Sequence, residues 1–265
     1  RNIVADASCD TCHNQLELHG GARIAVNSCM SCHNPGSTDA QSTNTVDMKV
    51  MIHKIHFGSE LPSVQDGGEY AIWGFRNSKH DYSHVAYPQD IRNCVNCHVG
   101  TGTVGDRTDL VLTNQGDNWA QVPTRAACGS CHENVNFDRH AGGQPDDSNC
   151  ASCHSTGGVA GSVEDSHLIP IDEARKLFLA EITDVDNSSP GQQPMISFKV
   201  SNPQTGEAYD ILSDPEFTSD GARLAVGMAW STSDYENTGN GSDNASQVQT
   251  DALANASANG DGSFT

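Results

Sequence analysis

Cys9-Asp10-Thr11-Cys12-His13 is the first of five segments in which two cysteines, three positions apart, are followed directly by a histidine. The five copies use all ten cysteines of the 265-residue chain, so none is left for another purpose. They are Cys9/Cys12/His13, Cys29/Cys32/His33, Cys94/Cys97/His98, Cys128/Cys131/His132 and Cys150/Cys153/His154.

This motif is typical of covalent haem c attachment. Its two thiols form thioethers with the vinyl groups of one porphyrin, and its histidine binds the iron from one side. Paired Cys-x-x-Cys units also build zinc ribbons, but zinc needs no histidine after each second cysteine, and five half-sites cannot pair. A disulfide framework does not require the histidines either. We therefore predict five covalently bound haem c groups, with the five motif histidines as proximal iron ligands.

The composition fits a chain that builds its core around cofactors. Apolar residues make up 35% and aromatic residues 6%, which is low for a globular protein. So polar a chain buries too little apolar surface to offset its conformational entropy unaided. We expect a pentahaem cytochrome domain over residues 1–168 that is mostly irregular, with short helices and little other regular structure.

The chain is strongly acidic, with 34 acidic residues against 14 basic ones and a formal charge of −20. This charge argues against nucleic acid and anionic lipid as partners, and solubility is its simplest explanation. Acidic side chains also tolerate divalent cations such as calcium, although no loop has the spacing of an EF-hand. No apolar stretch is long enough to span a bilayer.

Local patterns predict a few regular elements. Residues 46–57 are expected to form a helix with Thr45 or Asp47 as its cap and Gly58 at its end. After His167 the cysteines and histidines cease, and alternation predicts a partial all-β domain over residues 169–265, of sandwich or split-barrel type. Its expected strands are 176–185, 196–201, 208–212 and 223–230. A flexible tail rich in Ser, Asn, Gly and Asp is expected over 231–265.

Twelve histidines are present, and seven lie outside the motifs. If each iron takes two imidazoles, five of these seven are distal ligands. His53 and His56 lie on the same helical face and cannot face each other across one iron; either they serve two haems or one is solvated. His19 precedes two glycines that let the backbone approach a porphyrin. The remaining candidates are His80, His84, His140 and His167.

The sequence contains an ordered set of further segments: Cys9–His13, Leu18-His19-Gly20-Gly21-Ala22-Arg23, Cys29-Met30-Ser31-Cys32-His33-Asn34-Pro35, Met51-Ile52-His53-Lys54-Ile55-His56 and Tyr87-Pro88. This set resembles the outer-membrane multihaem cytochromes of the OmcA/MtrC family. The resemblance covers most of residues 1–230. Members of that family have two pentahaem domains, each paired with a β-barrel-like domain, so this chain is expected to be a fragment or a half-size relative.

The resemblance also implies a ligand set and a setting. It favours His19, His53, His56, His140 and His167 as the distal ligands, with His80 as first reserve. It implies electron transfer at the outer membrane, on the exterior of the cell, to ferric or manganese minerals, metal chelates or flavins. The implied partners are redox cytochromes of an outer-membrane conduit. A periplasmic or secreted location is the alternative, and any export signal is expected to have been removed.

Bis-histidine ligation leaves iron no open position for a substrate, so we expect an electron-transfer protein, not an enzyme. One alternative is a multihaem reductase of nitrite or another oxyanion. Such enzymes need an open iron, often marked by lysine in place of the motif histidine, and no such motif occurs here. The other alternative is a protein that stacks into conductive filaments.

Overall fold

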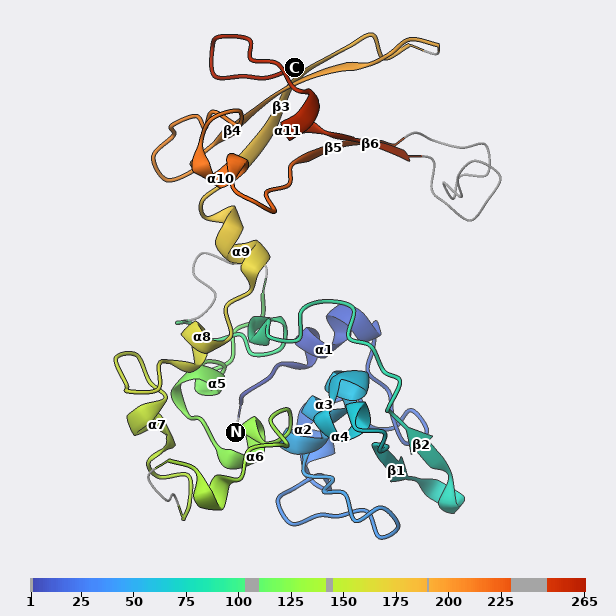
Figure 1. Cartoon of the computed structure of the whole chain (residues 1–265). Coiled ribbons are helices and arrows are strands. Elements are labelled where there is room, and N and C mark those ends of the chain that lie inside the picture. The colour runs from blue at the N-terminus through green and yellow to red at the C-terminus, as the bar shows by residue number, and fades with distance from the viewer. Residues whose placement is uncertain (1, 103–109, 142–144, 190, 230–246) are drawn as a thin grey trace. The chain divides into compact units, whose positions relative to one another are not determined.

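The computed structural model describes residues 2–102, 110–141, 145–189, 191–229 and 247–265. The chain divides into two compact units, Arg1–Ile169 and Pro170–Thr265 (Figure 1). All five Cys-x-x-Cys-His motifs lie in the first unit.

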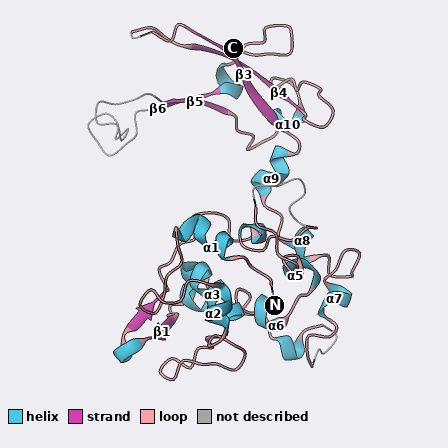
Figure 2. Cartoon of the chain, turned by 180° about the vertical axis from the view of Figure 1, so that it is seen from behind, coloured by secondary structure: helices cyan, strands magenta, loops and turns pink. Residues whose placement is uncertain are grey.

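The first unit consists mostly of loops that connect short helices, as the sequence predicts (Figure 2). One small antiparallel hairpin accompanies them. The helices are α1 (Asp6–His13), α2 (Val26–Met30), α3 (Met48–Phe57), α4 (Pro62–Gln65), α5 (Asn118–Gln121), α6 (Arg125–Cys128), α7 (Cys150–Cys153) and α8 (Val163–Ser166). Single 3-10 turns span Gly58–Glu60, Phe75–Asn77, Cys94–Asn96 and Phe137–Arg139, and the hairpin joins β1 (Ala71–Trp73) to β2 (Lys79–Asp81).

Helix α3 confirms the clearest helical pattern in the sequence, although it begins two residues later than expected. Asp47 is its N-cap, and its side chain accepts a hydrogen bond from the Lys49 backbone N–H at 3.2 Å. Gly58 ends the helix at a φ of 38°, a backbone region that glycine adopts without strain. The apolar face is anchored by Met51, which is buried.

The second to fifth motifs share one local geometry, a single helical turn, and the first motif forms the end of α1. The backbone N–H of the motif histidine donates to the carbonyl of the first cysteine of its motif, as from His33 to Cys29 at 2.9 Å and from His98 to Cys94 at 2.8 Å. The fourth and fifth motifs repeat this bond at 2.8 and 2.9 Å. One turn brings residues i and i+3 onto the same face, so both thiols of a motif can reach one porphyrin edge.

Few apolar side chains are buried in the described part of the first unit. They are Met51, Leu61, Tyr70, Ala71, Val99 and Ala120. This small set is what the polar composition leads one to expect, and it leaves much of the stabilisation to groups outside the polypeptide.

The second unit contains two antiparallel pairs of strands and a small core. Strand β3 (Leu179–Asp186) pairs with β4 (Met195–Ser201), and β5 (Ala225–Ala229) pairs with β6 (Gln247–Asp251). The core consists of Phe198, Val200, Ile211, Ala252 and Phe264. Three short helices complete the unit: α9 (Pro170–Arg175), α10 (Pro215–Thr218) and α11 (Ala252–Asn255). No closed sandwich or barrel forms among the described residues.

Three of the four predicted strands are confirmed with shifted bounds, but the strand expected over 208–212 is wrong. Within this segment only Ala208 forms a β-bridge, an isolated antiparallel one to Ser201. The Asp210 carboxylate then accepts the Leu212 backbone N–H at 3.0 Å and the Ser213 hydroxyl at 2.7 Å. Such a local turn competes with strand pairing and ends it.

The flexible tail expected over 231–265 is wrong for its last part, since residues 247–265 form β6, α11 and an edge of the core. Phe264 is 2% exposed. Its backbone exchanges two 2.8 Å hydrogen bonds with Phe198. Residues 231–246 lie outside the described part of the chain.

Candidate haem-binding sites

The structure brings each motif histidine against one of the five predicted distal histidines. The ring centroids of the two members lie 6.0 or 6.1 Å apart in every pair. The pairs are His13–His56, His33–His19, His98–His53, His132–His167 and His154–His140.

This separation fits two rings that share a metal, and it is nearly the same in all five pairs. A metal–imidazole nitrogen bond is about 2 Å long, so rings bound on opposite sides of one ion have centroids about 6 Å apart. Each pair therefore leaves room for one iron between its rings.

Hydrogen bonds to backbone carbonyls hold several rings in the orientation that an iron requires. The His33 Nδ1 lies 2.9 Å from the Val46 carbonyl. The His56 and His167 Nδ1 atoms lie 2.9 and 2.7 Å from carbonyls one helical turn earlier, those of Ile52 and Val163. An Nδ1–H that donates to a carbonyl leaves the Nε2 lone pair free for a metal.

The third pair is the most deeply buried. Burial, reinforced by the neighbouring His53, lowers the pKa of His98 to about 4. Burial is also the main cause that lowers the pKa of His53, with smaller contributions from His56 and Lys49. Both rings are therefore neutral at pH 7, which is the form of imidazole that binds a metal.

Helix α3 supplies rings to two different pairs. His53 faces His98 of the third motif, whereas His56 faces His13 of the first. The hypothesis that one of these histidines is merely solvated finds no support in this arrangement. The ring of Tyr87 packs edge-on against His56, at 5.7 Å and 88°, a contact that the sequence analysis did not identify.

His80 and His84 face no other histidine among the described residues. Both are exposed. The His80 Nε2 lies 3.1 Å from the Ser78 hydroxyl within the β1–β2 hairpin. The reserve candidate is therefore held by its own hairpin, away from any motif.

His19 adopts an uncommon backbone conformation, with a φ of 54°. Gly20 and Gly21 continue it at 83° and 79°. Left-handed backbone explains why glycines follow this histidine. A Cβ on Gly20 would meet no protein atom within 4 Å, so the close approach to a porphyrin stays a prediction.

Cysteines of different motifs lie near one another. Burial raises the pKa of Cys9 to about 11, and the nearby Cys97 and Cys29 add to the effect. Burial likewise raises the pKa of Cys94 to about 11, with a contribution from Cys131 of the fourth motif. Cys150 of the fifth motif contributes to the raised pKa of Cys128 in the fourth. The first motif thus has the second and third as neighbours, the third has the fourth, and the fourth has the fifth.

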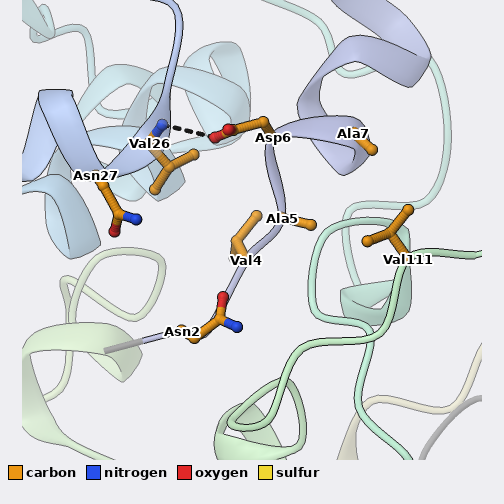
Figure 3. Close-up of a pocket in the computed structure, with 8 residues that line it drawn as sticks. All are labelled: Asn2, Val4, Ala5, Asp6, Ala7, Val26, Asn27 and Val111. Carbon is orange, nitrogen blue, oxygen red and sulfur yellow. Dashed lines mark hydrogen bonds between the residues drawn. The ribbon is translucent and has the colours of Figure 1, made fainter.

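Two cavities lie beside these elements. One of about 310 Å³ lies near the starts of α1 and α2. Its lining combines apolar side chains, such as Val26 and Val111, with the polar Asn2, Asp6 and Asn27 (Figure 3). The other, of about 120 Å³, opens against His56, Tyr87 and Ile91.

The set of donors fits haem better than a bare metal ion. Within the described ranges, no three His, Cys, Asp or Glu side chains converge as a metal cluster would require. The histidines come in pairs, each next to two free cysteines of one motif. A calcium site, which needs several oxygen ligands, is not among these groupings.

A comparison with protein families gives the same result. The family described as "Outer membrane cytochrome MtrC/MtrF-like, domains II/IV" matches residues 1–168. The chain belongs to this family. Membership implies covalently bound haem c in the first unit. None of the helices in the described residues is long and apolar enough to cross a membrane.

Individual relatives agree. The chain is 30% identical over 160 residues to the multiheme cytochrome MtrC of Shewanella baltica (strain OS185), a match that covers 59% of the chain and 18% of that protein. All of it superimposes on 38% of the outer membrane decaheme cytochrome OmcA, with a TM-score of 0.59 and 23% identity. The chain also superimposes on 38% of the crystal structure of MtrC from S. baltica OS185, with a TM-score of 0.52 and 22% identity. The two structural likenesses show the fold.

Proposed function

We propose that each of the five histidine pairs holds the iron of one haem c, and that the protein conducts electrons along the five sites. The observation that carries this proposal is the uniform 6.0–6.1 Å spacing of the pairs. Each pair joins one motif histidine to one histidine from elsewhere in the chain, and no motif is left without a partner.

The chemistry follows from the ligands. Haem supplies a one-electron ferric/ferrous couple when bound, and two axial imidazoles favour a lower potential than histidine–methionine ligation does. The ten cysteines would hold the porphyrins by thioether bonds. With haem bound, the paired imidazoles would supply both iron ligands, which would leave no position for a substrate and restrict the chemistry to electron transfer.

The closeness of neighbouring sites supports a conduit. Cysteines of the first motif lie near those of the second and third, those of the third near the fourth, and those of the fourth near the fifth. Helix α3 joins the first and third sites, because His56 and His53 lie one turn apart. Sites that each have a close neighbour suit a relay in which an electron passes from one haem to the next.

The setting is proposed from the relatives. We propose that the protein works at the outer membrane, exposed to the exterior, where it passes electrons from partner cytochromes to ferric or manganese minerals, metal chelates or flavins. The second unit would then belong to a sandwich or split-barrel domain. The chain spans less than half of the OmcA and MtrC chains that it matches, so these acceptors and partners are proposals.

Two alternatives differ in what they require. An oxyanion reductase needs one iron with an open position, whereas here each motif histidine faces a second imidazole. A filament needs chains that associate end to end. We accordingly propose a conduit and not an enzyme, and light scattering of the purified protein at increasing concentration would separate the conduit from the filament.

Spectroelectrochemistry of the purified holoprotein tests the proposal. We expect five haems per chain by mass, all reducible at potentials below those of histidine–methionine haems, and rapid reoxidation by ferric citrate. Fewer than five haems, or a haem that binds nitrite in the ferric state, would contradict it.

A further inference from the structure

Helix α3 contributes one histidine to each of two pairs. His53 lies in the third pair and His56 in the first. A shift or rotation of α3 therefore moves the histidine rings of two sites together. For electrons to pass on to the fourth site, that site must keep its position relative to both.

One ion pair links α3 to the fourth motif. Lys54 lies between His53 and His56, and its ammonium group donates to the carboxylate of Glu133. Glu133 directly follows His132 of the fourth motif. The two side chains are only 19% and 16% exposed.

Both ends of this pair are held by further contacts. The second oxygen of Glu133 accepts the backbone N–H of Ser63, at the start of α4, at 3.0 Å. The Lys54 ammonium lies 5.4 Å from the centroid of the Tyr70 ring, and Tyr70 is itself 2% exposed. Partly desolvated charges with several fixed partners hold one geometry, unlike solvated pairs, which exchange partners freely.

The chain contains a matched pair of the same kind on its surface. Lys79 contacts Glu69 at 2.5 Å and also lies 5.4 Å from an aromatic centroid, that of Trp73. The side chains of Lys79 and Glu69 are 41% and 53% exposed, and neither residue adjoins a motif. This surface pair is the natural control.

We propose that the Lys54–Glu133 pair is a brace that sets the orientation of His132 relative to His53 and His56, and so keeps the first, third and fourth haems in register. Lys54 and Glu133 act here as positioning residues. The inference rests on the proposed function, because it assumes haems at these three pairs.

Low-temperature electron paramagnetic resonance of the ferric holoprotein tests the brace, since the g-values of a low-spin haem report the orientation of its two imidazoles. Lys54→Met and Glu133→Gln should shift the signals of two or three of the five haems. Two variants that keep an ion pair, Lys54→Arg and the double variant Lys54→Glu with Glu133→Lys, should show the wild-type signals. Lys79→Met should leave all five unchanged.

The outcomes separate the two claims. A wild-type spectrum without five low-spin haems would overturn the proposed function. Five low-spin haems in the wild type, with unshifted signals and unchanged midpoint potentials in Lys54→Met, would overturn the brace alone. If Lys54→Met does not fold, the exchanged pair decides: wild-type g-values support the brace, and shifted g-values contradict it.

Discussion

At the scale of single residues, the histidine pairs connect this sequence to its chemistry. His56 and His80 make a useful contrast, because both lie outside the motifs and only His56 faces a motif histidine. His80 instead contacts Ser78 within its hairpin. Proximity to a second imidazole, and not histidine content, distinguishes a ligand.

Replacing His56 should open one iron. We expect His56→Ala to convert one of five haems from low spin to high spin, because His13 then has no opposing ring. The measurement is the high-spin ferric signal in electron paramagnetic resonance, quantified against total haem. His80→Ala is the control and should keep all five low spin. A fully low-spin His56→Ala protein would refute the assignment.

Asp39 should contribute stability that depends on pH. It accepts hydrogen bonds from the Ser42 hydroxyl and from the backbone N–H groups of Ser42, Gln41 and Trp73, and the Ser42 hydroxyl is the main cause that lowers its pKa. A lowered carboxyl pKa stabilises the fold above the unfolded value of about 3.9, and this contribution disappears as pH falls through the folded pKa.

We therefore expect Asp39→Asn to cost about 1–3 kcal/mol at pH 7, since the amide cannot accept all these donors. Chemical denaturation followed by circular dichroism at pH 7 and at pH 3 provides the measurement. The difference between wild type and variant should shrink at the lower pH. An equal difference at both pH values would refute the role of the charge.

The attachment residues can be predicted from local sequence alone, whereas the pairing of the histidines can be predicted only in part. Motif spacing is local, so Cys9 to His13 can be interpreted without a fold. The partnership of His13 with His56 crosses more than forty residues and depends on how α3 packs. Helical periodicity alone excludes that His53 and His56 bind one iron from opposite sides, but it does not say which motif histidine each of them faces.

At the scale of elements, α3 was predictable and β6 was not. Met48 to Phe57 carries a cap, an apolar stripe and a terminating glycine, which are all local signals. β6 and the Phe264 bridge lie in a stretch rich in Ser, Asn and Gly, and its polar composition predicts a loop. Pairing with β5 and burial of one phenylalanine outweigh that local preference.

Phe264 should be essential to the second unit. The ring of Phe264 packs beside that of Phe198, with their centroids 6.1 Å apart. We expect Phe264→Ala to destabilise this unit by about 3–5 kcal/mol, because loss of the ring leaves a cavity there. Amide hydrogen exchange in β4 is the measurement. Met195→Ala, on the same strand but 51% exposed, should change little. Equal protection in both variants would contradict this account of the core.

At the scale of the whole molecule, net charge should govern the choice of soluble acceptor. A charge of −20 repels anions and attracts cations over a distance set by ionic strength. The haem propionates would add further negative charge. The rate constants for electron transfer to a cationic and to an anionic acceptor should therefore change in opposite directions as the salt concentration rises.

We expect the rate constant for reoxidation by ferric citrate to rise with ionic strength, and that for hexaammineruthenium(III) to fall, each by roughly tenfold as the Debye length shortens from about 30 Å to about 8 Å. Stopped-flow absorbance gives both rates on one preparation. The same direction of change for both acceptors would show that local charge at the exit haem, and not net charge, controls the encounter.

The central claim is that all five irons carry two imidazoles, so that the chain conducts and does not bind substrate. The most direct test is the low-temperature electron paramagnetic resonance spectrum of the ferric protein, integrated against the protein concentration. The account predicts five low-spin haems per chain and no high-spin signal. A high-spin component in the intact protein, or fewer than five haems, would contradict it.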